Sequence, residues 1–414
     1  MQACIHRGAS EIGGSCVELE HDCQRIVLDI GLPLSHEPDQ PTDLPAVRGL
    51  APGTDLEGLL AVVLSHTHPD HMGLLADVSP DVPVYGGEAA SRVTQTAALF
   101  MRDGAAPREW RPLLDREKVT LGPFVVTPLL VDHSAFDAFA LLVEAGGRRV
   151  LYSGDLRAHG RKPSTWRRLL DEPPADVNAL LLEGTRMSRV TEHNTTEREV
   201  EQQLAALCRE TTGMVLVFYS GQNIDRLVTV YRATKQAGRL LILDLYGAAV
   251  AAATGRDTIP QASWDGIRVL VPHGQRRRII ESKRFDEIDA VRPHRIFPEE
   301  LAEIAPRSVL TMRGSMTREL ERAECLRGAA AVWSMWPGYL DDPSGQRLRA
   351  WLAKHEIPLT AIHASGHASV ADLQELAEAV AAERVVPIHT SVPERYAQIF
   401  SNVEVHQDGV WWPV

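Results

Sequence analysis

Cysteine is too sparse and too scattered in this sequence to build a disulfide framework or a thiolate metal site. The five cysteines, Cys4, Cys16, Cys23, Cys208 and Cys325, form no CxxC pair, and their number is odd. Reduced, mostly buried thiols fit this pattern best. Metal or acid–base chemistry is therefore expected from histidine and carboxylate side chains.

Basic charge and long apolar segments are also scarce. The formal net charge is −12, which argues against a protein that coats nucleic acid with a basic surface. The N-terminal MQACIHRGAS has no basic stretch followed by an apolar one, and the most apolar later run, LLILDLYGAAVAAA, contains Asp244. We therefore expect no signal peptide, no membrane span and a cytoplasmic location.

One segment departs from this acidic background. HGQRRRIIESKR holds Arg276, Arg277, Arg278, Lys283 and Arg284, and acidic residues follow at once in FDEID. A solvated helix face and a phosphate-contacting surface both fit this composition. The sequence leaves the choice between them open.

The stretch LSHTHPDHMGL concentrates the side chains that bind metals. Three histidines and one aspartate fall within the six residues from His66 to His71. A lone histidine is usually a half-buried or strand-end residue, but crowded imidazole and carboxylate groups are the usual ligands of zinc-like ions. Side chains this close along a turn cannot all converge on one tetrahedral centre, so the spacing favours two neighbouring ions.

Short apolar runs elsewhere in the chain also end in ligand-type or acid–base residues. RIVLDIG ends near Asp29, AVVLSHTHPDH near His66, FVVTPLLVDHS at His133, RRVLYSGD at Asp155, NALLLEGT at Glu183 and RVVPIHT at His389. Such endings predict a buried sheet whose active site lies along one edge, outside the strand ends.

The middle of the chain has a different pattern. Thr196 and Glu199 form a capping-box pattern before a helical spacing of apolar residues, and MVLVFYS, a second helix and RLLILDL then predict a βαβ unit. The length of 414 residues allows two domains. We therefore expect an α/β domain over 191–344, inserted into a metal-binding domain formed by 1–190 and 345–414.

These motifs resemble a known family. HTHPDH, with His133, the SGD aspartate Asp155 and the LDIG aspartate Asp29, resembles the ordered motifs of the metallo-β-lactamase fold. LLLEGT, HASGHAS and PIHT resemble motifs A, B and C of its β-CASP nuclease branch, which includes ribonuclease J. The resemblance implies an α/β protein: an αββα sandwich with an inserted α/β β-CASP domain. Ribonuclease J carries a further C-terminal domain, for which we expect no counterpart in this sequence.

The resemblance also implies a centre with two divalent ions, zinc or alternatively manganese. One ion would be bound by His66, His68 and His133, the other by Asp70, His71 and His389, with Asp155 as the bridge and Asp29 supporting the histidines from behind.

Phosphodiester hydrolysis needs a strong nucleophile, neutralised phosphate charge and a proton donor for the leaving oxygen. We assign catalytic roles to Asp70, Glu183 and His367, with His367 as the general acid and Glu183 holding its ring. His363, Ser365 and Gly366 would contact phosphate, and Ser369 would cap the helix that follows.

The expected function is that of a ribonuclease acting on single-stranded RNA in a cleft between the two domains. RNA is favoured over DNA because His389 matches motif C, where DNA-specific members of the family tend to carry an apolar residue. No membrane partner is expected, and a homo-oligomer is left open. Three alternatives remain. A thioester or lactam hydrolase would not need so large an insert, and a redox diiron protein would be expected to have more carboxylate than HTHPDH offers. In a non-catalytic nucleic-acid-binding paralogue, a ligand should be missing.

Overall fold

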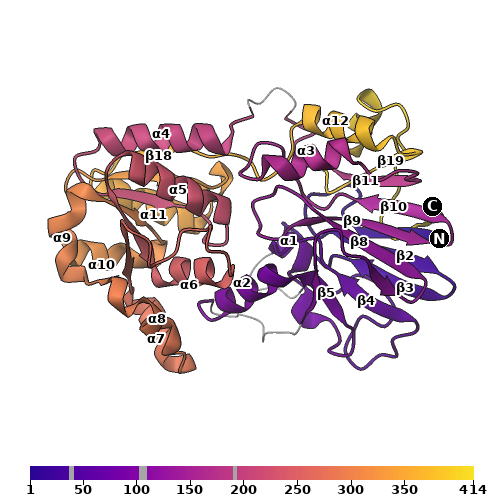
Figure 1. Ribbon diagram of the computed structural model, residues 1–414, viewed down its shortest axis with the longest axis horizontal. Helices are drawn as coiled ribbons and strands as arrows, with labels where there is room; N and C mark the ends of the chain where they lie inside the picture. The colour runs from indigo at the N-terminus through magenta and orange to yellow at the C-terminus, as the bar shows by residue number, and fades with distance from the viewer. Residues whose placement is uncertain (37–41, 102–109, 190–193) are drawn as a thin grey trace. The chain divides into compact units, whose positions relative to one another are not determined.

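The computed structural model describes residues 1–36, 42–101, 110–189 and 194–414. The chain divides into two compact units, which we describe separately (Figure 1). The first comprises Met1–Ser91, Ala105–His193 and Gly366–Val414, and the second comprises Arg92–Gly104 and Asn194–Ser365.

The first unit contains two mixed sheets. One has the strand order β20-β1-β2-β3-β4-β5-β6, and the other has the order β19-β11-β10-β9-β8-β7. The strands of the first sheet are β1 (Gln2–Arg7), β2 (Cys16–His21), β3 (Gln24–Leu28), β4 (Leu59–Val63), β5 (Val84–Gly87), β6 (Arg111–Leu113) and β20 (Trp411–Pro413). Those of the second are β7 (Val119–Leu121), β8 (Phe124–Leu130), β9 (Phe139–Ala145), β10 (Arg148–Tyr152), β11 (Ala179–Glu183) and β19 (Arg384–Ile388).

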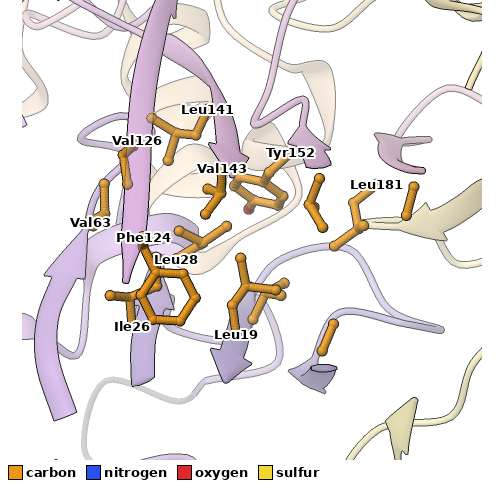
Figure 2. Close-up of a cluster of buried hydrophobic side chains, with 14 of the residues drawn as sticks. Leu19, Ile26, Leu28, Val63, Phe124, Val126, Leu141, Val143, Tyr152 and Leu181 are labelled. Carbon is orange, nitrogen blue, oxygen red and sulfur yellow. The ribbon is translucent and has the colours of Figure 1, made fainter. Parts of the chain in front are cut away.

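The two sheets share one apolar core. Leu19, Ile26 and Leu28 from the first sheet pack in the same buried cluster as Phe124 and Leu141 from the second, as Figure 2 shows. The outer face of the second sheet carries α3 (Pro163–Asp171) and α12 (Val370–Val380), and a separate apolar cluster covers the outer face of the first. This layered α/β arrangement is the predicted metallo-β-lactamase fold.

The second unit is built on one parallel sheet with the order β15-β14-β13-β16-β12-β17-β18. Its strands are β12 (Val215–Phe218), β13 (Leu240–Asp244), β14 (Ile267–Leu270), β15 (Arg295–Ile296), β16 (Ser308–Thr311), β17 (Ala330–Trp333) and β18 (Leu359–Ala361). One face is covered by α4 (Glu197–Glu210), α5 (Ile224–Gln236), α6 (Leu245–Ala253), α7 (His273–Ser282) and α8 (Asp286–Val291), and the other by α9 (Leu301–Ile304), α10 (Thr317–Arg322) and α11 (Pro343–Lys354). Helices on both faces explain why the central strands β12, β16 and β17 are buried along their whole length.

The second unit differs from the expected insert in two respects. It continues to Ser365 instead of ending at 344, because β18 pairs with β17 and so adds a strand to this sheet. The expected βαβ unit is also not a pair of neighbouring strands, since β16 lies between β12 and β13.

The predicted helix starts are confirmed. Thr196 and Glu199 form a reciprocal capping box at the start of α4. Ser369 caps α12 and forms a capping box with Asp372. Among the described residues, no helix combines the length and apolar character that a membrane crossing requires.

Candidate metal centre

Loops at the strand ends of both sheets in the first unit carry the predicted side chains. They are Asp29 after β3, His66 after β4, His133 after β8, Asp155 after β10, Glu183 at the end of β11 and His389 after β19. Each follows its strand by no more than three residues, so the position of the strand fixes the position of the side chain.

One group of donor atoms gathers around His66. The ligand atoms of His66, His68, His133 and Asp155 all lie within 4.8 Å of one another. The His66 Nε2 atom is 3.6 Å from Asp155 Oδ2, and His133 Nε2 is 3.0 Å from His68 Nδ1. The four groups therefore converge on a common point.

A second group shares Asp155 with the first. The ligand atoms of Asp70, His71, Asp155 and His389 also lie within 4.8 Å of one another. The His71 Nε2 atom is 3.3 Å from Asp155 Oδ2, and His389 Nε2 is 3.6 Å from Asp70 Oδ2. Since Asp155 belongs to both groups, it lies where a bridging ligand would be needed.

The backbone holds the HTHPDH loop tightly. The short helix α1 (Pro69–Met72) carries Asp70 and His71, and the carbonyl oxygens of both residues accept backbone N–H groups, from Ser15 and Ile30 respectively. A Cβ atom at residue 31 would meet the Asp70 carbonyl oxygen at 1.8 Å. Only glycine fits at residue 31, and its absence of a side chain lets the loop pack this closely.

Asp29 anchors two of the imidazole rings from the outside. Its Oδ2 atom is 2.7 Å from His71 Nδ1 and accepts the Ser65 hydroxyl at 2.6 Å. The Ser65 Oγ atom is in turn 3.0 Å from His66 Nδ1. Because the outward nitrogens face these partners, the Nε2 atoms of both rings point into the site.

His389 reaches the same aspartate through a longer chain. Its Nδ1 atom is 2.8 Å from Ser15 Oγ, Ser15 hydrogen-bonds the Tyr152 hydroxyl, and Tyr152 donates to Asp29 Oδ2 at 2.8 Å. Burial, followed by the charge of Asp29, raises the pKa of Tyr152 well above its usual value, so its hydroxyl stays protonated. Three histidines are therefore oriented from one buried carboxylate.

His133 has a different partner. Its Nδ1 atom is 2.6 Å from the carbonyl oxygen of Gly366. A Cβ atom at residue 366 would lie 2.9 Å from Ser134 Oγ and 3.3 Å from His133 Cε1. Glycine therefore lets the HASGH backbone approach the ring closely.

Burial controls the protonation of most of these rings. It lowers the pKa of His66 and His133 well below the usual value, with a further contribution from neighbouring histidines, and it also lowers the pKa of His68 and His389. His71 is the exception: burial acts to lower its pKa, but Asp155 and Asp29 outweigh burial and raise it well above the usual value. Neutral imidazole is the form that binds a metal.

The donor set fits divalent cations. The buried Nε2 atoms of His66, His71 and His389 and both carboxylate oxygens of Asp155 have no hydrogen-bond partner within the described part of the chain. Buried polar atoms without partners are costly unless an ion or water satisfies them. Imidazole nitrogen and carboxylate oxygen are ligands for zinc-like ions.

His367 and Glu183 form an adjoining pair. His367 Nδ1 lies 3.3 Å from Glu183 Oε1 and 3.6 Å from Asp155 Oδ2. The Glu183 carboxylate also accepts the backbone N–H groups of Leu156 and Thr185. Burial acts to lower the pKa of His367, but Glu183 and Asp155 raise it to about 9. The ring therefore favours its protonated form.

The three expected phosphate contacts fall in different parts of the structure. Gly366 lies in the first unit beside His133. His363 and Ser365 belong to the second unit, on the segment that follows β18. Their contact with phosphate stays a prediction.

Three residues of this site were missed from the sequence. Ser15, Ser65 and Tyr152 connect Asp29 to the histidines. Ser65 precedes the histidine motif directly and Tyr152 precedes SGD, so position along the chain offered a signal for both. Ser15 lies far from any ligand in the sequence, and only the fold brings it to His389.

Comparison with known proteins identifies the class. Residues 26–217 match the family described as "Beta-lactamase superfamily domain". Together with the layered sheets, the clustered donors and the relatives below, this match supports a ribonuclease J-like member of the β-CASP family within the metallo-β-lactamase superfamily. The class and the donor set together support a metal-dependent hydrolase.

The similar proteins carry a more specific name than the family model does. The chain is 28% identical over 243 residues to Ribonuclease J of Mycobacterium tuberculosis, covering 56% of this chain and 42% of that protein. It is 26% identical over 234 residues to Ribonuclease J of Sinorhizobium meliloti, covering 53% and 40%. The chain thus spans about two fifths of the length of these relatives. A crystal structure of a protein of unknown function from Enterococcus faecalis V583 has the same fold, with a TM-score of 0.81, 20% identity and 99% of both chains covered.

Proposed function

We propose that this protein is a metal-dependent ribonuclease that hydrolyses RNA phosphodiester bonds. One observation carries the proposal. Buried donor atoms of His66, His71, His389 and Asp155 point at shared positions without hydrogen-bond partners among the described residues, in a chain similar to proteins named Ribonuclease J.

Two divalent ions, zinc or alternatively manganese, would occupy the two donor groups. His66, His68 and His133 would hold one, Asp70, His71 and His389 the other, and Asp155 would bridge them. When bound, such a pair supplies a deprotonated water at neutral pH and neutralises phosphate charge. Asp29 keeps the rings of His66, His71 and His389 oriented, directly or through Ser65, Ser15 and Tyr152.

His367 is the proposed proton donor to the leaving oxygen. Its Nδ1 faces Glu183 and Asp155, and we assign delivery of the proton to Nε2. Once Asp155 binds a cation, its influence on the imidazolium falls, so Glu183 is the partner on which the protonated form depends. Glu183 is a positioning residue in this scheme, because it acts through His367.

RNA is the proposed substrate, single-stranded and favoured over DNA. Two features support the choice: His389 stands at the position of motif C, and the relatives are named Ribonuclease J. His363, Ser365 and the Gly366 backbone are the proposed phosphate contacts.

End-labelled RNA and DNA of the same sequence, incubated with the purified protein with and without chelator, test the proposal. We expect RNA to be cleaved in a reaction that chelator abolishes and added zinc or manganese restores, with DNA cleaved more slowly. The product ladder also separates internal cleavage from removal of nucleotides at one end. Hydrolysis of a thioester or lactam without cleavage of RNA would overturn the proposal in favour of a small-molecule hydrolase.

A further inference from the structure

The helix α7 concentrates positive charge on an acidic protein. Residues 273–284 hold five basic side chains against one acidic one, in a chain of formal net charge −12. Four of the five, Arg276, Arg277, Lys283 and Arg284, are exposed, and Arg278 is half-buried. In Figure 1, α7 lies at the end of the second unit opposite α4. The surface charge here is therefore opposite in sign to that of the whole chain.

Four acidic residues in and just after α7 already have basic partners. Glu281 pairs with Arg277, Asp286 and Glu287 pair with Arg284, and Asp289 pairs with Arg292. By contrast, the side chains of Arg276, Arg278 and Lys283 make no ion pair within the residues that the structure describes. The positive charge that is left over thus belongs to these three residues.

A buried side chain holds α7 against the core of the second unit, and apolar side chains on and near the helix are exposed to solvent. Ile279 is fully buried in the core of the second unit, which fixes the face that α7 turns outward. Ile280 on α7 is 50% exposed, and Phe285, just before α8, is 51% exposed. An exposed aromatic residue that directly follows a run of basic residues is a combination that binds single-stranded nucleic acid, because bases stack on the ring while the cations contact phosphates.

We propose that α7 is an auxiliary binding surface for the RNA strand, with Arg276, Arg278 and Lys283 contacting phosphates. The surface contains no residue of the metal centre, so it contributes to affinity and not to the chemical step. The proposal rests on the proposed function for the identity of the occupant.

Salt dependence measures this contribution directly. For single-stranded nucleic acid, the slope of log K against log salt is about −0.7 per neutralised phosphate. Replacing Arg276, Arg278 and Lys283 by glutamine should therefore make the slope shallower by about 2 and weaken binding by on the order of ten- to a hundred-fold at 0.1 M salt. The measurement is fluorescence anisotropy of a labelled oligouridylate, made in chelator so that the RNA is not cleaved.

A matched variant controls for total charge. Arg198, Arg232 and Lys235 are exposed residues of α4 and α5, and replacing them by glutamine removes the same charge. We expect this control to keep the wild-type slope to within about one phosphate contact. Equal slopes in the two triple variants would overturn the proposal, since only net charge would then matter.

Cleavage assays test the RNA-binding role of α7 separately from the proposed ribonuclease function on which it rests. With metal present, the α7 variant should hydrolyse bis(p-nitrophenyl) phosphate at the wild-type rate, because this small diester needs no auxiliary surface. If the wild-type protein cleaves RNA but the α7 variant binds RNA with the wild-type salt dependence, the RNA-binding role of α7 is wrong and the proposed function stands. A wild-type protein that binds RNA through α7 but hydrolyses no phosphodiester would overturn the proposed function alone.

Discussion

Buried polar side chains occur at strand ends in both units, but they are satisfied in different ways. In the first unit, the carboxylate oxygens of Asp155 and the Nε2 atoms of His66, His71 and His389 have no hydrogen-bond partner in the described residues. In the second, Asp244 at the end of β13 accepts hydrogen bonds from Gln275, Thr311 and Arg313. Buried polar atoms without hydrogen-bond partners indicate a binding site for an ion or ligand. A network in which every polar group has a partner instead holds loops together.

The pair Glu197–Arg226 shows the second behaviour most fully. Both side chains are completely buried and lie 2.8 Å apart. Thr229 donates to Glu197, and Arg226 donates to Ser334 and to the Ala364 carbonyl. A buried polar side chain therefore does not by itself identify a binding site. A binding site is indicated when the buried polar atoms lack hydrogen-bond partners.

Asp155→Ala should produce the largest change. It removes the only side chain shared by both donor groups, so elemental analysis should show a fall from about two ions per chain to less than any single histidine variant retains. RNA cleavage should fall to background. Retention of both ions would contradict the bridging position.

His367→Ala should affect turnover without affecting metal. General acid catalysis contributes about 10²- to 10⁴-fold, and the single-turnover rate should fall by that amount while both ions and RNA binding remain. Glu183→Gln should give a smaller loss in the same direction, and the two losses should not add, because Glu183 acts through His367. If His367→Ala releases metal, the residue is a ligand and the division of roles is wrong.

Glu197→Ala tests whether the fully hydrogen-bonded Glu197–Arg226 pair stabilises the second unit without contributing to the metal centre. It leaves the Arg226 guanidinium buried without its carboxylate, which typically costs about 3–5 kcal/mol. Denaturant unfolding should show this loss, while the metal content of the folded protein stays at the wild-type value. Metal lost at unchanged stability would show that the second unit contributes to the centre, contrary to the comparison.

Tyr152→Phe should have the smallest effect. It breaks the hydrogen-bond chain from His389 through Ser15 to Asp29 but keeps the ring in the core. Loss of such an outer partner typically lowers metal affinity about 10- to 100-fold, and we expect the lower end because only one histidine is affected. Competition with a chromophoric chelator measures the affinity, and a fall as large as that for Asp155→Ala would show that Tyr152 does more than orient His389.

How much of this was predictable depends on whether a feature is local or long-range. HTHPDH and the strand-end residues were recognisable because ligand spacing and strand periodicity are local properties. The assignment of β18 to the second unit was not, because LTA carries no information about which sheet it joins. Likewise, nothing in the sequence places β16 between β12 and β13, or Ser15 beside His389.

Two residues of the centre have an uncommon backbone conformation. Asp29 and His389 adopt left-handed conformations, with φ of 59° and 53°. Residues other than glycine, asparagine and aspartate lose roughly 1–2 kcal/mol in this conformation, so the cost falls on His389. Replacing His389 by glycine would relieve that strain and remove a donor at the same time. Folding stability and the proposed function thus make opposite demands at this position, so selection of this protein for thermal stability alone would act against His389.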